Sequence, residues 1–280
     1  MPPCKTIGIV GGGGRLGRAL ACRLAGDGVR AEIYDLPVFD VSSYEAVAAI
    51  VDHCHAIVNC AEQRPEPDAP AGEELHRVNA VLPGRLADAA AARGRYLLHV
   101  STAAVFVGVV GRRGATPFFR EDAAALGGDH YARTKVNGEC AVRAWRGKYA
   151  ILRLGPLYGD GEGAVDAWLA DARAGRALRV RPGGWAAPTP MAAAARAAAA
   201  LLEARAEGVY HFAASGKADE ADVAAEILRG HGGRRLIERL AGAPEYPAGL
   251  RCGKIDRHLP FARPAWRRAL RLFLDGGGGK

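Results

Sequence analysis

The sequence shows none of the features typical of a secreted protein, a membrane-spanning protein or a protein stabilised by metal ions. Its six cysteines form no Cys-x-x-Cys pair, so neither a zinc ribbon nor a disulfide framework is expected. No stretch reaches the roughly 18 uninterrupted apolar residues that a membrane helix needs, and the Ala-rich run from Met191 to Leu202 is broken by Arg196. The first residues lack the basic, apolar and small-residue succession of a signal peptide, which predicts a cytoplasmic location.

Two further classes of partner find little support. The net charge is +8, but the arginines are spread along the chain and no basic run is interleaved with aromatic residues, so no nucleic-acid partner is expected. The run Asp52-His53-Cys54-His55 has the residue types of a metal site, yet adjacent side chains point in different directions and metal sites use wider spacings, so no metal is expected. A small anionic substrate accounts for the basic charge equally well, and the compositional bias toward Ala, Gly and Arg accounts for most of it.

The 280 residues, 49% hydrophobic and 24% charged, are typical of a soluble α/β protein with a sizeable core. Apolar runs alternate with amphipathic helical runs, an order that predicts a doubly wound parallel sheet of the Rossmann type. The expected strands are 5–10, 30–35, 56–60, 95–101 and 149–154, and the expected helices are 15–25, 43–52, one ending near 92, and 131–145.

After Gly155 the pattern loosens into Gly- and Pro-rich loops. We therefore expect a Rossmann-type domain over 1–160, a fold that commonly binds NAD(P), and a smaller lobe over 161–280. Segment 190–215 should return to the main sheet through a strand over 208–213. Helices are expected near 164–174, 191–204, 218–229 and 264–274.

The glycine loop follows the first expected strand and opens the first helix. Gly11, Gly14 and Gly17 give the spacing G-x-x-G-x-x-G. Missing side chains let the backbone turn tightly and approach a pyrophosphate, whose charge the helix N-terminus favours. The placement between strand and helix, more than the spacing, predicts a dinucleotide site.

Asp35 ends the second expected strand, about 20 residues after the glycine loop. A carboxylate there accepts hydrogen bonds from the adenosine ribose and repels a 2′-phosphate, which favours NAD(H). Arg15 and Arg18 lie close by and are able to bind a phosphate, so NADP(H) stays open.

Tyr131 and Lys135 lie four residues apart on an expected helix and therefore share one face. Reduction of a ketone needs a proton donor, and a nearby ammonium makes a tyrosine proton easier to transfer. Thr102, at the carboxyl end of its strand, is placed to hydrogen-bond the same carbonyl oxygen. These three residues are the predicted catalytic set.

With these motifs in place, the chain resembles the extended short-chain dehydrogenase/reductases that act on sugar nucleotides, and among them the dTDP-4-dehydrorhamnose reductases. The supporting segments run through nearly the whole length, among them Ile57-Val58-Asn59-Cys60-Ala61, Val78-Asn79-Ala80, His99-Val100-Ser101-Thr102 and Pro264-Ala265-Trp266. The resemblance implies hydride transfer from a nicotinamide to C4 of a 4-keto-6-deoxysugar on a nucleotide.

Carried over by position, the resemblance implies cofactor contacts from the glycine loop to the catalytic helix: Gly11, Gly14, Arg15, Leu16, Gly17, Asp35, Asp40, Val41, Cys60, Ala61, Glu62, Asn79, Tyr131 and Lys135. It places Gln63 beside the middle of the cofactor as well as near the substrate. The implied substrate contacts are Gln63, Thr102, Ala103, Pro156 and Trp185. A homodimer is compatible with the resemblance.

The chain departs from these reductases where the substrate would bind. Ala103 and Ala104 replace an acidic and an aromatic residue, Pro156-Leu157 replaces a tryptophan, and the loop 62–67 has its own sequence. We therefore expect a related reaction on a different ketone. An epimerase or dehydratase of the same superfamily remains an alternative, although Ala103 and Ala104 disfavour a dehydratase. A non-catalytic regulatory subunit is a further alternative. His99 is expected to be a satisfied core residue.

Overall fold

The structure, a computed structural model, describes residues 6–35, 43–65, 72–107, 118–181, 183, 187–229, 237–241 and 249–276. Three predicted site residues lie outside this part of the chain: Asp40, Val41 and Trp185.

A parallel sheet of six strands forms the centre of the molecule. Its strands are rich in buried aliphatic residues, as expected where helices cover both faces of a parallel sheet. From one edge to the other they are β2 (Arg30–Tyr34), β1 (Thr6–Val10), β3 (Ala56–Asn59), β4 (Tyr96–Thr102), β6 (Lys148–Leu154) and β10 (Gly208–Phe212). The predicted Rossmann-type fold class is confirmed.

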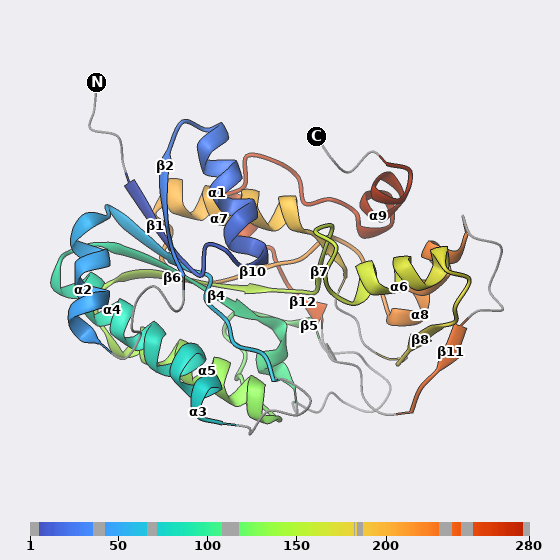
Figure 1. Cartoon of the computed structure of the whole chain (residues 1–280), viewed down its shortest axis with the longest axis horizontal. Helices are drawn as coiled ribbons and strands as arrows, with labels where there is room; N and C mark the ends of the chain where they lie inside the picture. Colours follow the sequence, from blue (N-terminus) through green and yellow to red (C-terminus); the bar gives the residue numbers. More distant parts are fainter. Residues whose placement is uncertain are drawn as a thin grey trace.

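Helices pack against both faces of this sheet (Figure 1). One face carries α1 (Arg15–Gly26) and α7 (Met191–Ala204), which contact each other closely. The other face carries α2 (Tyr44–His53), α4 (Leu82–Ala92) and α5 (His130–Ala144). Each face has its own apolar core, built around Ile9, Leu20 and Leu201 on the first and Val51, Ile57 and Leu86 on the second. The two layers fix the strands from both sides.

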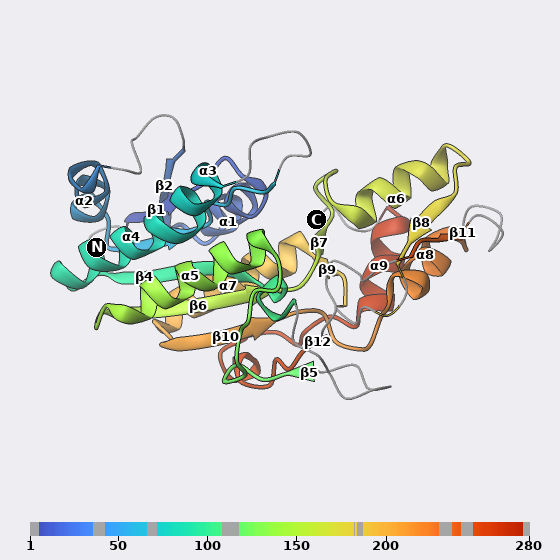
Figure 2. The ribbon, with the colours of Figure 1, turned by 90° about the horizontal axis from the view of Figure 1, so that it is seen from below.

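A smaller lobe lies beyond the carboxyl ends of the strands (Figure 2). A third core, which includes Leu169, Ile227 and Trp266, holds it together. Its elements are α6 (Ala164–Arg173), β8 (Leu178–Val180), α8 (Glu220–Leu228), β11 (Ile237–Arg239) and α9 (Trp266–Leu274). The expected strand over 208–213 is present as β10 in the main sheet, while the boundary near 160 stays a prediction.

Short elements connect these parts. The described segments include α3 (Glu73–His76), a π-helix over Arg77–Val81, 3₁₀ helices over Ala103–Phe106 and Ile255–Arg257, and the pairs β5 (Phe118–Phe119) with β12 (Gly249–Leu250) and β7 (Leu157–Tyr158) with β9 (Thr189–Pro190). None of the described helices is long and apolar enough to cross a membrane.

Candidate active site

Helix α5 carries Tyr131 and Lys135, and its start is fixed by a side-chain cap. The carboxylate of Asp129 accepts a hydrogen bond from the backbone N–H of Ala132 at 2.7 Å, which satisfies one of the free donors of the first turn. Further along, a Cβ at Gly138 would lie 2.2 Å from the carbonyl oxygen of Asn79. Only a glycine allows this close approach of α5 to the π-helix.

Tyr131, Lys135 and Glu62 meet at the carboxyl ends of β3 and β4. The phenol of Tyr131 donates a hydrogen bond to Oε1 of Glu62 at 2.5 Å. The ammonium of Lys135 lies 3.7 Å from the same oxygen and donates to the carbonyl of Val100 at 3.2 Å. Lys135 is only 2% exposed, so one carboxylate oxygen joins the phenol to a buried ammonium.

Thr102 closes β4 two residues beyond Val100. Its hydroxyl oxygen accepts a hydrogen bond from the backbone N–H of Ala104 at 3.1 Å and so caps the 3₁₀ helix that follows. A hydroxyl that accepts in this way keeps its own hydrogen for donation. Thr102 can therefore donate to an oxygen placed at this end of the sheet.

Asn79 holds the loop after β3 against α5. Its side-chain oxygen accepts from the backbone N–H of Gln63 at 2.9 Å, and its amide group donates to the carbonyl of Gln63 and to the hydroxyl of Thr134. Asn79 lies inside the π-helix, a rare geometry that often occurs at functional sites. Asn79 is predicted to contact a cofactor. In the structure its side-chain amide holds the backbone of Gln63 in place.

A buried network of charged side chains joins helix α5 to the central sheet. Glu139 lies one turn after Lys135 and pairs with Arg153 of β6 at 2.6 Å, with exposures of 2% and 1%. Its other oxygen accepts from the hydroxyl of Ser101 at 2.7 Å. Arg153 also contacts Nε2 of His211 at 3.3 Å. These contacts tie α5 to β4, β6 and β10.

His99 is buried in the middle of β4. Nδ1 lies 3.2 Å from the side-chain nitrogen of Asn59, whereas Nε2 has no hydrogen-bond partner among the residues that the structure describes. Burial, with a contribution from Lys135, lowers the pKa of His99 well below its usual value. The expected core position is observed, although the expected full satisfaction of the ring is not.

The glycine loop is shaped by close backbone contacts. A Cβ at Gly17 would lie 2.3 Å from the carbonyl oxygen of Gly11, so α1 can pack against the loop only because residue 17 has no side chain. The cap residue of α1, Gly14, has no side chain that could occupy the helix N-terminus. Such a helix end attracts anions, and the residues present fit the diphosphate of a dinucleotide.

Asp35 faces this loop from the end of β2, and both of its carboxylate oxygens lie 2.9 Å from the backbone N–H of Gly13. Arg15 instead reaches across to the segment after β7. Its guanidinium binds both oxygens of Asp160 at 2.5 Å and the carbonyls of Leu157 and Glu162. Asp35 therefore lies where the ribose is predicted, while the charge of Arg15 is engaged with Asp160.

The remaining predicted site residues differ in how exposed they are. Cys60, Ala61 and Gln63 belong to the loop beside Tyr131, and Pro156 precedes β7; all four are partly exposed. By contrast, Ala103 is 1% exposed and packs in the core, as does the side chain of Leu16. The structure therefore does not bring these two side chains to the surface of the site.

Sequence reasoning missed three contributors. The link between Glu62 and Tyr131 had no signal in the spacing, because the two residues are 69 positions apart. The same holds for Asp160 and Arg15, which are 145 positions apart. Glu139 could have been found, since a carboxylate four residues after Lys135 shares a helix face with it.

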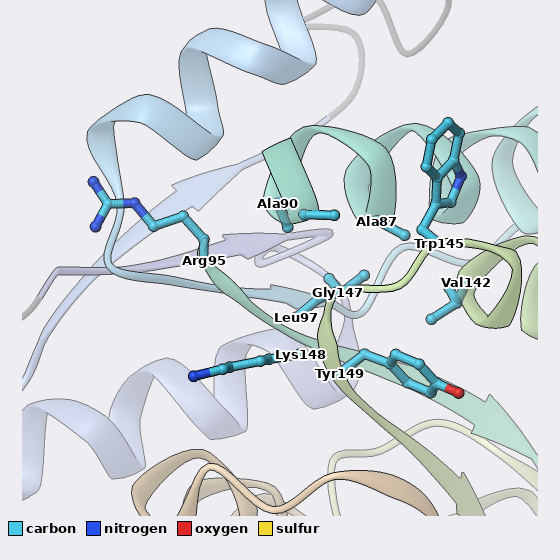
Figure 3. Close-up of a pocket in the computed structure, with 10 residues that line it drawn as sticks. Ala87, Ala90, Arg95, Leu97, Val142, Trp145, Gly147, Lys148 and Tyr149 are labelled. Carbon is cyan, nitrogen blue, oxygen red and sulfur yellow. The ribbon is translucent and has the colours of Figure 1, made fainter. Parts of the chain in front are cut away.

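A pocket lies at the opposite, amino ends of the strands, between the ends of α4 and α5 and the starts of β4 and β6 (Figure 3). Ala87, Ala90 and Val142 give it an apolar floor, and Tyr149 and Trp145 border it. Ligands of open α/β sheets bind outside the carboxyl ends of the strands. This pocket is thus separate from the candidate site.

Comparison with known proteins decides the family. A family model described as RmlD substrate binding domain matches residues 5–277. This chain belongs to that family. It is 36% identical over 163 residues to dTDP-4-dehydrorhamnose reductase of Mycolicibacterium smegmatis, and the match covers 57% of this chain and 48% of the relative. It is 31% identical over 170 residues to methionine adenosyltransferase 2 subunit beta of Xenopus laevis, covering 57% and 49%. This chain spans about half the length of the curated relatives it matches.

Solved structures resemble this chain over nearly its whole length. The crystal structure of a dTDP-4-dehydrorhamnose reductase from Clostridium acetobutylicum superposes with a TM-score of 0.82 at 26% identity, covering 96% of this chain and 98% of that one. The dTDP-4-dehydrorhamnose reductase from Bacillus anthracis, in complex with NADP, gives a TM-score of 0.84 at 22% identity, with 97% and 98% covered. The second likeness shows the fold alone.

Proposed function

We propose that this protein reduces a ketone on an anionic sugar nucleotide, with Tyr131 as the proton donor. The observation that carries the proposal is the meeting of the Tyr131 phenol and the buried Lys135 ammonium at one carboxylate oxygen, beside Thr102 at the carboxyl ends of the strands. The reductase relatives of the same family support the reaction class.

Each residue has a separate task in this proposal. A reduced dinucleotide, with its diphosphate held at the glycine loop, would supply a hydride to the carbonyl carbon. Tyr131 gives its proton to the carbonyl oxygen, and Thr102 donates a hydrogen bond to the same oxygen. Lys135, held by the carbonyl of Val100, stabilises the phenolate that remains. A solvent proton then restores the phenol.

We further propose that the cofactor is NAD(H) in preference to NADP(H). The Asp35 carboxylate faces the glycine loop at 2.9 Å from Gly13, where it would repel a 2′-phosphate. NADP(H) remains the alternative, since Arg18 lies at the same loop and its guanidinium donates to the carbonyl of Gly13. Dissociation constants for NADH and NADPH, measured on wild type and on Asp35→Asn, test the preference. We expect wild type to bind NADH more tightly and the variant to lose most of that difference.

The activity is tested by following NADH and NADPH absorbance with a panel of nucleotide-linked keto-sugars. Tyr131→Phe should lower kcat/KM by roughly 100-fold or more while leaving the dissociation constant for the cofactor within a few fold. The matched control is Tyr149→Phe, because Tyr149 lies at the pocket at the amino ends of the strands, away from the candidate site. This control should keep full activity.

Two outcomes would overturn the proposed reduction. Conversion of a sugar nucleotide without net consumption of reduced cofactor would indicate an epimerase or dehydratase. A stoichiometric protein partner, with no ketone-dependent oxidation of NADH or NADPH, would indicate a non-catalytic subunit; the Xenopus laevis relative is named as a subunit of methionine adenosyltransferase 2.

A further inference from the structure

Glu62 is in direct hydrogen-bond contact with the predicted proton donor. Its Oε1 accepts the Tyr131 hydrogen bond at 2.5 Å and lies 3.7 Å from Nζ of Lys135. Its Oε2 accepts from Nε of Arg64 at 3.2 Å. The backbone of Gln63, the next residue, is fixed by Asn79. The carboxylate is therefore held in place by both side-chain and backbone contacts.

The groups around Glu62 keep it negatively charged. Partial burial opposes ionisation, but Lys135, Arg64 and the Tyr131 hydrogen bond together hold the pKa of Glu62 below its usual value. Burial raises the pKa of the neighbouring Cys60 thiol to about 12, so this thiol is uncharged at neutral pH. His99 of β4 is kept neutral by burial and by Lys135. Of these groups, Glu62 is the anion in hydrogen-bond contact with Tyr131, and the ammonium of Lys135 meets the same carboxylate oxygen.

The two nearest charges act on the phenol in opposite directions. An ammonium favours the phenolate, whereas a carboxylate that accepts the phenolic hydrogen favours the protonated form. The carboxylate is also in direct hydrogen-bond contact with the phenol. With Lys135 alone, ionisation of Tyr131 would be easier, and less phenol would remain to protonate a ketone at alkaline pH.

We propose that Glu62 holds the proton on Tyr131 and so keeps the site in the form that reduces ketones. This inference rests on the proposed function, in which Tyr131 is the proton donor. During turnover the hydride adds to the carbonyl carbon, and the two electrons of the carbonyl π bond move to its oxygen, which takes the proton of Tyr131. The phenolate then takes one proton from solvent water, leaving hydroxide. Glu62, 32% exposed, begins and ends this cycle as a carboxylate.

A direct titration of Tyr131 tests the proposal without any substrate. Ultraviolet difference absorbance of tyrosinate is recorded against pH for wild type and for Glu62→Gln, and the corresponding curves on a Tyr131→Phe background are subtracted. We expect the Tyr131 midpoint in Glu62→Gln to lie about one pH unit or more below wild type. A midpoint that is unchanged or higher overturns the proposal.

A second tyrosine–glutamate pair supplies the control. The phenol of Tyr34 donates to Glu32 at 2.9 Å on β2. Glu32→Gln removes the same charge from the protein but should leave the Tyr131 midpoint unchanged. If Glu32→Gln shifts that midpoint as far as Glu62→Gln does, the effect is one of net charge and the proposal fails.

The pH profile of ketone reduction separates this inference from the proposed function. Reduction needs the phenol, so the rate falls as pH rises through the Tyr131 midpoint, and this fall should begin at lower pH in Glu62→Gln. Absence of any ketone reduction, with a shifted titration, would contradict the proposed function only. Tyr131-dependent reduction with identical profiles in both proteins would contradict the role of Glu62 only.

Discussion

The two halves of the candidate site are built in different ways. On the cofactor side, residues 11–17 owe their shape to missing side-chain atoms, since a single Cβ at Gly17 would collide with the backbone. On the catalytic side, the shape depends on charges: Lys135 and Glu62 at the surface of the site, and Glu139 with Arg153 beneath it. The first half should be sensitive to volume and the second to charge and pH.

The largest effect on cofactor affinity should come from filling the space that the glycine loop needs. Gly17→Ala places a methyl group 2.3 Å from the carbonyl oxygen of Gly11 and 2.6 Å from Cα of Gly12, so the backbone must move. We expect cofactor affinity to fall by roughly 100-fold or more, equivalent to about 3 kcal/mol. Calorimetric titration with NADH and NADPH measures this.

Gly26→Ala is the matched control, because it lies in the same helix α1 and a Cβ there meets nothing within 4 Å. It should leave affinity unchanged. Equal losses in both variants would mean that helix α1, and not the loop contact, is responsible.

The buried ion pair should have the largest effect on the free energy of unfolding. Arg153→Met leaves the Glu139 carboxylate buried without its closest cation, and such a change lowers the free energy of unfolding by about 3–5 kcal/mol. Urea denaturation measures the loss. Arg143→Met removes a half-exposed partner of the same carboxylate and should cost less than about 1 kcal/mol. If the two variants are equally stable, the buried network does not support α5 as the geometry indicates.

The smallest of the three effects concerns pH. Burial and Arg153 lower the pKa of His211 from 6.5 to about 3. The unfolded chain therefore binds a proton that the folded protein rejects, so stability is full above pH 6.5 and declines as pH falls toward 3. Between pH 7 and 5 this histidine should remove about 2 kcal/mol from the free energy of unfolding.

His211→Gln should flatten this decline, while His53→Gln, at an exposed residue that pairs with Glu32, should keep it. Denaturation curves at several pH values give the slopes. A wild-type slope retained in His211→Gln would show that other groups cause it.

The same contrast explains how far the sequence could predict the structure. The strand and helix periodicities predicted the sheet, and the local spacings G-x-x-G-x-x-G and Tyr-x-x-x-Lys predicted the ends of the strands where the site lies. These signals are local, so they survive without knowledge of the fold. Pairings between distant residues, such as Glu62 with Tyr131, depend on loop conformation and leave no trace in spacing.

The side chains of some predicted site residues take directions that only the fold decides, while their roles stay predictions. Ala103 was expected near a substrate, but the 3₁₀ helix that Thr102 caps turns it into the core. Arg15 was expected at a pyrophosphate, yet a carboxylate from the segment after β7 reaches its guanidinium. In both cases tertiary contacts, and not residue type, decide where the side chain points.

The π-helix over Arg77–Val81 makes the length of this segment as important as its composition. A π-turn contains one residue more than an α-turn, and each residue advances a helix by about 100°. Loss of one residue from this turn would rotate Asn79 away from Gln63 and Thr134, while every side chain in α4 kept its chemistry. Substitutions around Asn79 are therefore easier to accommodate than a single deletion, which would detach the loop carrying Glu62 from the helix carrying Tyr131.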